Sequence, residues 1–362
     1  MDDESEDVTS KPMTKDKLND RSYPLIVIGA SAGGFEVIKE IVANLPKDFH
    51  AAIFIVWHIS PSTSGILPQV LNRYNTVVAG HGYDGEAIKP QRIYVAPPDR
   101  HMLLDDGIIK ITRGPKENRF RPAIDPLFRS AAFHYRTKVT GIILSGALDD
   151  GTAGLWTIKH FGGTAIVQDP AEAEVKGMPQ SAIRQVKVDY CLTVKGIIDY
   201  MTNMVEKKTF EKDHEVMLQD KKTEAEIKVA GESNALEANI MKFGSLTPFT
   251  CPECHGVLTA LNEEKIRRYR CHTGHAFSAD SLLDALTENI EESLYSAIRG
   301  VDESIMLLNH MGDHFAEMNE TKIAALYFMK AKEASDRSNI MRQAVLKHEH
   351  LSKQTIEDEL KH

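Results

Sequence analysis

Three polar side chains that together could cleave an ester lie after apolar runs in the first half of this 362-residue chain. Ser31 stands in the glycine-rich stretch Gly-Ala-Ser-Ala-Gly-Gly, directly after an apolar run. His58 follows a second apolar run and Asp150 a third. A serine on a tight turn can act as a nucleophile, a histidine as its general base, and a carboxylate can orient the imidazole. These residues therefore indicate an acyl-transfer site with Ser31, His58 and Asp150 as catalytic residues.

The glycine-rich stretch has a second interpretation, because N–H groups at the start of a helix can also bind a phosphate. The dinucleotide pattern Gly-x-Gly-x-x-Gly is not met, since Ser31 takes the place of the middle glycine, and the usual acidic ribose partner is absent. Each candidate also has a structural interpretation: a plain turn, a strand-end histidine and a helix-capping aspartate. A nucleotide-binding protein and a non-catalytic adaptor therefore stay as alternatives.

A second group of chemically active residues lies near the middle of the second half of the chain. Cys251 and Cys254 form a Cys-x-x-Cys pair, and Cys271 follows after sixteen residues in the stretch Cys-His-Thr-Gly-His. Thiolate and imidazole pairs at this spacing bind Zn²⁺ tetrahedrally. We expect a structural Zn²⁺ site with Cys251, Cys254, Cys271 and His275 as ligands, and His272 as the rival fourth ligand. Four protein ligands would close the site, so the metal would take no part in catalysis, for which no cofactor is expected.

The elements that must position Ser31, His58 and Asp150 follow from the alternation of apolar runs with helical periodicity. Strands are predicted at 25–28, 52–57, 92–96, 108–112, 140–144, 164–167 and 190–192, and helices near 35–44, 66–73, 126–135, 153–160 and 178–186. Several of the runs are apolar on both faces, as in parallel sheets covered by helices. This pattern predicts an α/β fold, a doubly wound, mostly parallel, Rossmann-like sheet, with its crevice at the carboxyl ends of the strands.

Changes in composition divide the chain into five parts. We expect a disordered tail, the α/β domain, a charged linker, a zinc-ribbon-like module and a helical tail, at residues 1–22, 23–205, 206–249, 250–277 and 278–362. In the last part, apolar residues recur in steps of three and four, with Ser278 as a plausible N-cap and a break near Gly312. Such a stripe predicts a helical hairpin or a coiled coil through which the chain could self-associate.

Composition excludes several classes of protein. The formal net charge of -9 argues against a surface that binds nucleic acid throughout. The charge is uneven, since residues 23–205 hold 19 Lys and Arg against 17 Asp and Glu, whereas residues 278–362 hold 9 against 16. No apolar run is long enough for membrane insertion, and the polar first residues exclude a secretory signal. Four cysteines are too few for a disulfide scaffold, and Cys191 reads as a small strand residue, so a cytoplasmic protein is expected.

Several blocks of the first 205 residues, in the same order, resemble the CheB-type chemoreceptor methylesterases. These blocks lie at residues 28–34, 56–58, 94–101, 121–128, 144–151, 168–170 and 177–179. The resemblance implies hydrolysis of glutamyl methyl esters on the signalling helices of methylated chemoreceptors, with release of methanol; some family members also deamidate glutamine. It implies Ser31 as the nucleophile, His58 as the base and Asp150 as the orienting residue. The Cys-His-Thr-Gly-His stretch also resembles an extension of some stand-alone members. With this resemblance, the non-catalytic alternative becomes an adaptor that binds receptors or a methyltransferase.

The sequence departs from the family pattern at two positions. Ala147 replaces a methionine found in many members, and Asp149 replaces an asparagine, so Asp149 could share the orienting role. Only about 22 residues precede the first strand, too few for the receiver domain of the response-regulator members, so the enzyme is expected to be constitutively active or regulated through its C-terminal additions. The slightly basic domain fits a glutamate-rich receptor surface, with Arg100, Arg119, Arg121 and Arg129 as candidate contacts.

Overall fold

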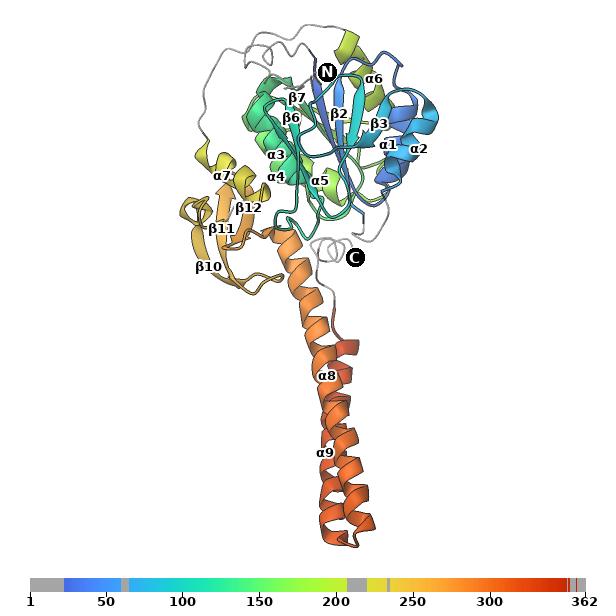
Figure 1. Ribbon diagram of the computed structural model, residues 1–362, viewed down its shortest axis with the longest axis vertical. Coiled ribbons are helices and arrows are strands. Elements are labelled where there is room, and N and C mark those ends of the chain that lie inside the picture. Colours follow the sequence, from blue (N-terminus) through green and yellow to red (C-terminus); the bar gives the residue numbers. More distant parts are fainter. Residues whose placement is uncertain are drawn as a thin grey trace, which may run out of the picture.

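The computed structural model describes residues 23–59, 65–206, 220–232, 235–349, 351 and 356. The expected disordered tail at 1–22 and residues 207–219, 233 and 234 of the expected linker lie outside the described residues. Figure 1 shows an α/β body, a small β module beside it, and a long helical hairpin that extends away from both.

A seven-stranded parallel sheet forms the centre of the α/β body, with the strand order β3-β4-β2-β1-β7-β8-β9. Its strands are β1 Leu25–Ala30, β2 Ala52–Trp57, β3 Val78–His81, β4 Arg92–Val95, β7 Val139–Ile143, β8 Thr164–Gln168 and β9 Tyr190–Leu192. The prediction of a doubly wound parallel sheet is confirmed. The expected strand at 108–112 does not belong to it: β6 Ile108–Thr112 pairs antiparallel with β5 His101–Asp105 in a separate hairpin.

Helices cover both faces of this sheet, as the two-sided apolar strands predicted. The helices are α1 Gly34–Ala43, α2 Leu67–Leu71, α3 Ile124–Tyr135, α4 Thr152–His160, α5 Gly177–Gln185 and α6 Val194–Glu206, with short 3₁₀ turns at Asn72–Tyr74 and Arg136–Lys138. Along β1, Leu25 and Val27 pack against the side of α3, α4 and α5, whereas Ile26 and Ile28 pack against the side of α1, α2 and α6. Both faces of the strand are therefore buried, which makes β1 the centre of the core.

The order of the strands places a crevice at the end of β1. The chain runs from β1 to β2 on one side, and later returns to β1 through β7 on the other. Ligands of open α/β sheets bind where the strand order reverses in this way, outside the carboxyl ends. The segments after β1, β2 and β7 carry Ser31, His58 and Asp150, so the topology brings all three to this edge.

The second half of the chain builds a small antiparallel sheet and a helical hairpin. The sheet has the order β10-β11-β12-β13, with β10 Ser245–Thr250, β11 Val257–Glu263, β12 Ile266–Cys271 and β13 Ala276–Ser278. It is preceded by α7 Lys221–Ala230 and a 3₁₀ turn at Ile240–Phe243, and followed by α8 Ala279–Glu317 and α9 Thr321–Leu346. We call residues 220–232 and 235–290 the C-terminal module.

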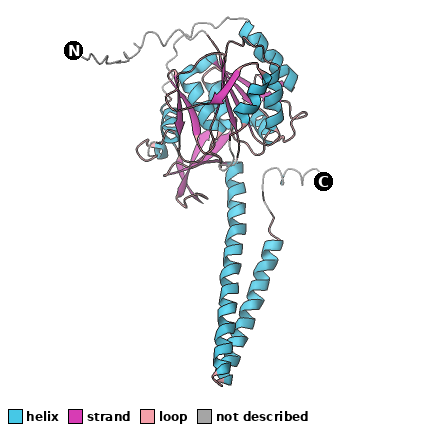
Figure 2. Ribbon diagram, turned by 45° about the vertical axis from the view of Figure 1, so that its right-hand side comes forward, coloured by secondary structure: helices cyan, strands magenta, loops and turns pink. Residues whose placement is uncertain are grey.

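The two long helices pack against each other and project from the body (Figure 2). Ser278 caps α8 as expected, and the chain reverses at residues 318–320 rather than near Gly312, which lies inside α8. None of the helices in the described part of the chain has the length and apolarity needed to cross a membrane.

Candidate functional site

Ser31 stands on the turn between β1 and α1, and the surrounding backbone holds this turn tightly. Its N–H donates to Ser145 O at 2.9 Å, and the indole Nε1 of Trp57 donates to its carbonyl at 3.1 Å. Gly33 caps α1 with φ of 73°, and a Cβ at this position would lie 2.6 Å from the Ser145 Oγ. Only glycine suits both the left-handed backbone and the lack of space, which explains the glycine-rich sequence around the serine.

His58 lies directly after β2, beside the Ser31 turn. Its N–H donates to Ala30 O at 3.0 Å, and its side chain is only 3% exposed. The ring nitrogen Nε2 lies 2.8 Å from Asp150 Oδ2, whereas the buried Nδ1 has no hydrogen-bond partner in the described part of the chain. The ring also stacks on Phe120, with centroids 3.7 Å apart and planes 8° from parallel. One ring nitrogen thus contacts a carboxylate, and the other makes no hydrogen bond that would compete with proton transfer.

Asp150 is fully buried, and several donors converge on its two carboxylate oxygens. Besides His58, it accepts hydrogen bonds from the N–H groups of Ile124 at 2.7 Å and Gly151 at 2.9 Å, and from Asn118 Nδ2 at 2.8 Å. Burial alone would raise the pKa of this carboxyl group, but the hydrogen bond and the attraction of His58, followed by the Ile124 and Asn118 donors, lower it below its usual value. Asp150 is therefore held as a carboxylate beside the imidazole.

The two neighbouring aspartates have different surroundings. Asp125, on α3, is buried beside Asp150, and desolvation together with the charge of Asp150 raises the pKa of Asp125 to about 8. Asp149 accepts a hydrogen bond from Ser278 Oγ at 2.6 Å. Asp150 makes the contact with His58, whereas Asp149 joins the α/β body to the start of α8.

The loop of residues 113–122 holds two contacts that sequence reasoning missed. Asn118 donates to Asp150 and to Asp125 Oδ2, the latter at 2.9 Å, and Phe120 stacks on His58. No local pattern distinguishes these residues from an ordinary polar loop. The one available signal in the sequence is weak. Asparagine tolerates a left-handed backbone better than most residues, and Asn118 adopts one, with φ of 49°.

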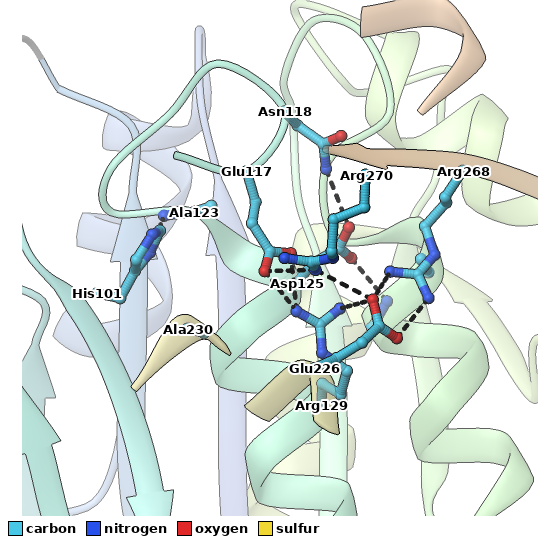
Figure 3. A network of polar contacts seen from close by, with 12 residues as sticks. His101, Glu117, Asn118, Ala123, Asp125, Arg129, Glu226, Ala230, Arg268 and Arg270 are labelled. Atoms are coloured by element: carbon cyan, nitrogen blue, oxygen red, sulfur yellow. Dashed lines mark hydrogen bonds and ion pairs between the residues drawn. The ribbon is translucent and has the colours of Figure 1, made fainter. Parts of the chain in front are cut away.

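A buried network of ion pairs joins the same loop to the C-terminal module (Figure 3). Glu117 of the loop pairs with Arg129 of α3 at 2.7 Å and with Arg270 of β12 at 2.8 Å. Glu226 of α7 pairs with Arg268 at 2.7 Å and with Arg270 at 3.0 Å. Arg268 reaches Glu263 as well, at 2.7 Å, so three arginines and three glutamates balance in charge.

This network overturns two expectations drawn from charge alone. The segment 206–249 reads as a charged linker or a solvated helix, and its residues 221–230 do form a helix, α7, but this helix is not solvated on all sides, since Glu226 is 0% exposed. Arg129, a candidate for a receptor surface, is 1% exposed and neutralised by Glu117. Arg119 pairs with Asp284 and Glu288 of α8. Burial and pairing within the chain remove both of these arginines from the expected docking surface.

The remaining two arginines of that group, Arg100 and Arg121, both pair with Asp99, at 3.5 and 2.7 Å. The side chain of Arg100 is 41% exposed. Of the four candidates, Arg100 is therefore the one that best retains the exposure that an external contact needs.

Four potential metal ligands meet at one end of the small sheet. Cys251, Cys254, Cys271 and His275 offer donor atoms that all lie within 4.8 Å of one another. The Cys254 and Cys271 sulfurs are 3.6 Å apart, and His275 Nδ1 is 3.7 and 3.8 Å from the sulfurs of Cys271 and Cys251. Bond lengths of Zn²⁺ to sulfur and nitrogen imply donor separations of roughly 3.5 to 3.8 Å in a tetrahedron. The donor set therefore fits Zn²⁺, and the exposed rival His272 lies outside it.

Known proteins resemble this chain over about half of its length. The family model of the CheB methylesterase matches residues 26–201. A putative protein-glutamate methylesterase/protein-glutamine glutaminase of Leptospira interrogans is 41% identical over 179 residues, which cover 49% of this chain and 93% of that protein. A protein-glutamate methylesterase/protein-glutamine glutaminase of Thermotoga maritima is 35% identical over 188 residues, 51% of this chain and 55% of that protein. The crystal structure of the Thermotoga maritima CheB methylesterase catalytic domain is 34% identical, covers 50% of this chain and 98% of that one, and gives a TM-score of 0.48.

The relatives are named as methylesterases, which places this α/β chain in the class of carboxylic ester hydrolases. More narrowly, the chain belongs to the CheB methylesterase family. The matched region ends near α6, so the C-terminal module and the α8–α9 hairpin lie outside the region shared with these relatives.

Proposed function

We propose that this protein hydrolyses glutamyl methyl esters on chemoreceptor-like signalling helices, with Ser31 as nucleophile, His58 as general base and Asp150 as the residue that orients the imidazole. The observation that carries the proposal is the state of the His58 ring. Asp150 holds its Nε2, while its buried Nδ1 has no partner among the described residues, and the backbone N–H of His58 donates to Ala30, the residue before Ser31. In this proposal, Nε2 fixes the orientation of the ring through Asp150, and Nδ1 takes and returns the proton.

The reaction follows from these positions. Ser31 Oγ attacks the ester carbonyl carbon while His58 takes the hydroxyl proton, and the tetrahedral intermediate expels methoxide, which receives that proton and leaves as methanol. A water molecule then attacks the glutamyl-serine ester, with His58 again as the base. The products are a free glutamate side chain and the restored serine. Asp150 stabilises the imidazolium ion in both halves of the cycle.

The same chemistry would accept a glutamine side chain, with ammonia as the leaving group in place of methanol. The names of the relatives carry both activities. We propose deamidation as a second reaction of the same site, and the cytoplasm, where the four cysteines would stay free of disulfides as they are in this structure, as its location.

Methanol release from methylated chemoreceptor membranes tests the proposal. We expect Ser31→Ala to remove this activity, because no other group would supply the nucleophile. Ser293→Ala, on the exposed part of α8, is the matched control and should retain full activity. Equal release by wild type and Ser31→Ala would exclude the serine mechanism, and no release by either would favour the adaptor.

We propose further that Cys251, Cys254, Cys271 and His275 hold one structural Zn²⁺. The close spacing of these four donors supports the assignment. The metal would join the turn after β10 to the end of β12, and its four protein ligands would keep it out of catalysis. About one Zn²⁺ per chain should be found by atomic emission, and the double variant Cys251→Ser/Cys254→Ser should lack it. Unchanged metal content in that variant would refute the ligand set.

We also propose that the chain divides functionally at the expected boundaries, with the esterase in residues 23–205, the metal module in 250–277 and an association element in 278–362. Exposed apolar side chains on the α8–α9 hairpin support association with a second copy. Among them are Ile290, Met306, Leu307, Leu326, Met329 and Ile340. Light scattering on the full chain tests this, since a monomer at high concentration would contradict it.

A further inference from the structure

The loop of residues 113–122 lies between the proposed catalytic residues and the C-terminal module, and it extends the small sheet. Asn118 N–H donates to Ala276 O at 2.8 Å, and Ala276 N–H donates to Lys116 O at 3.2 Å. Lys116 Nζ also pairs with Glu253, in the Cys-x-x-Cys turn, at 3.0 Å. The loop is therefore held by the module through its backbone as well as through the buried ion pairs of Glu117.

Asn118 is in contact with both sides of this junction. Its Nδ2 donates to Asp150 Oδ1 at 2.8 Å and to Asp125 Oδ2 at 2.9 Å. Its Oδ1 accepts from the Ser278 N–H at 2.8 Å and from Ser281 Oγ at 3.1 Å. All five residues are less than 9% exposed, so water does not compete for these contacts. We call Ser278 and Ser281, which also cap α8, the α8 cap.

Rotating the Asn118 side-chain amide so that its oxygen and its NH₂ group change places would lose hydrogen bonds. The Ser278 N–H can only donate, so it requires the carbonyl oxygen of Asn118 on its side. The opposite end then presents its NH₂ group, with two donors, to two carboxyl groups. The Ser278 N–H also donates to Ser281 Oγ at 2.9 Å, but a rotated amide would still place its oxygen against the Asp150 carboxylate and its NH₂ group against the Ser278 N–H, so two acceptors and two donors would face each other in a buried site. The α8 cap therefore determines which end of Asn118 faces Asp150.

A second contact ties the same loop to α8. Arg119 pairs with Asp284 and Glu288 on the first turns of α8, and the next residue, Phe120, stacks on the His58 ring. Both the imidazole and its carboxylate partner thus touch a loop whose position depends on the C-terminal module. This observation is independent of the Asn118 amide and points the same way.

We propose that Asn118 is a positioning residue for Asp150, and that the α8 cap, by orienting its amide, makes the activity of the esterase site depend on the C-terminal module. The inference rests on the proposed function of Ser31, His58 and Asp150. It concerns regulation of that site: a ligand or partner that moves the module would withdraw a donor from Asp150 without touching the substrate.

Two variants of the full chain test the proposal. Asn118→Gly removes the amide and keeps a residue that accepts the left-handed backbone. Ser281→Ala removes one donor from the Asn118 oxygen and lies outside the catalytic machinery. Loss of a hydrogen bond to a charged group should lower kcat about 10- to 100-fold in Asn118→Gly, and the effect of Ser281→Ala should be about threefold. KM should change little in either variant, because neither side chain is proposed to contact substrate.

The pH profile separates positioning from a general structural role. The groups that face the Asp125–Asp150 pair are His58, His101, Glu117, Arg129 and Arg268. All are unchanged in both variants. Because Asn118 stabilises the Asp150 carboxylate, its loss raises the pKa of Asp150, and the acid limb of the kcat profile should move to higher pH. A structural defect alone would lower kcat at every pH and leave the limb in place.

Four outcomes test this proposal. The activity is measured as methanol release, and circular dichroism checks that each variant is folded. A lowered kcat with a shifted acid limb in Asn118→Gly, and a smaller change of the same kind in Ser281→Ala, would support the proposal. Wild-type kcat and profile in a folded Asn118→Gly would overturn it. If Asn118→Gly fails to fold, a wild-type profile of Ser281→Ala overturns the role of the α8 cap. Ser31-independent release by the wild type would instead defeat the proposed function, so the two failures are distinguishable.

Discussion

The α/β body and the C-terminal module are stabilised by different interactions. Each face of the seven-stranded sheet buries a large apolar cluster that includes most of the strand residues. The module has only two small clusters, around Phe277 and around Val229. Its interior is completed by the Cys and His cluster and by the balanced ion pairs of Glu226, Arg268 and Arg270.

The comparison shows what a small β module needs when its apolar core is insufficient. Small domains bury a lower share of their surface, so a metal or another crosslink commonly supplies the missing stability. Buried charges contribute little net stability, but they require specific partners in a specific geometry. The apolar body would tolerate small shifts, whereas the junction with the module has one favourable arrangement. We expect damage to the two regions to have different consequences.

Metal removal should have the largest effect on stability, and the module should lose its fold while the α/β body keeps its own. Structural Zn²⁺ contributes on the order of 10 kcal/mol to the folding of small zinc-binding modules. A chelator or the variant Cys271→Ser should therefore abolish the unfolding transition of the module in calorimetry, while that of the α/β body remains. Cys191→Ser, at an exposed cysteine of the body, is the matched control and should change neither transition. If calorimetry shows one unfolding transition at an unchanged temperature after complete metal removal, the module does not depend on the metal separately from the α/β body, and this prediction is contradicted.

Asp150→Asn should leave both regions folded and remove most of the activity. An amide cannot stabilise the imidazolium form of His58, and loss of an orienting carboxylate in a triad lowers kcat by roughly 10⁴-fold. Asp149→Asn is the matched control, because Asp149 contacts Ser278 rather than His58. We expect it to stay within a few-fold of wild type in methanol release. Equal effects of the two substitutions would argue against Asp150 as the orienting residue.

Glu226→Gln should destabilise the junction between the two regions. The change leaves Arg268 and Arg270 buried without full compensation, at a cost of about 3 to 5 kcal/mol in the free energy of unfolding. Glu224→Gln lies two residues away on α7, where Glu224 forms an exposed pair with Lys228, and should cost less than about 1 kcal/mol. Urea unfolding of both variants measures the difference. If the two variants lose equal stability, the buried network is not what holds the junction.

Acid should weaken the same junction by a somewhat smaller amount. Attraction to Arg129 and Arg270 outweighs burial and lowers the pKa of Glu117 from 4.5 to about 2. Its folded pKa lies below its unfolded value, so its contribution is full above pH 4.5 and is lost as the pH falls toward 2, for a total of about 3 kcal/mol. Glu117→Gln should flatten this part of the curve of stability against pH. A curve of unchanged slope in that variant would assign the acid sensitivity to other groups.

Asp125 contributes to the pH dependence with the opposite sign. Its pKa is raised to about 8, so the folded state retains a proton that the unfolded chain has lost above pH 4. Stability due to this group therefore falls as the pH rises from about 4 to 8. For these two groups together, the free energy of unfolding should be highest near the pH at which Glu117 is already ionised and Asp125 is still protonated.

The pattern of the sequence predicted the body better than the junction. Apolar runs and glycine-rich turns are local signals, so most strands of the sheet and the positions of Ser31, His58 and Asp150 at their ends could be predicted, although β3 and β5 were missed. The Cys-x-x-Cys spacing likewise predicted which four potential metal ligands lie close together. Glu226 and Arg129 are different: each reads as an ordinary surface charge, and only contact with residues distant in the chain makes it a buried partner.

The amino-acid sequence is enough to specify the family, the parallel sheet and the side chains capable of the chemistry, because periodicity and motifs are properties of short segments. How those side chains are held depends on the folded chain. The donors to Asn118 come from residues 278 and 281, some 160 positions later, and the module reaches the loop through β13 and α8. No local pattern encodes such a contact, since it exists only once two regions distant in the chain have packed together.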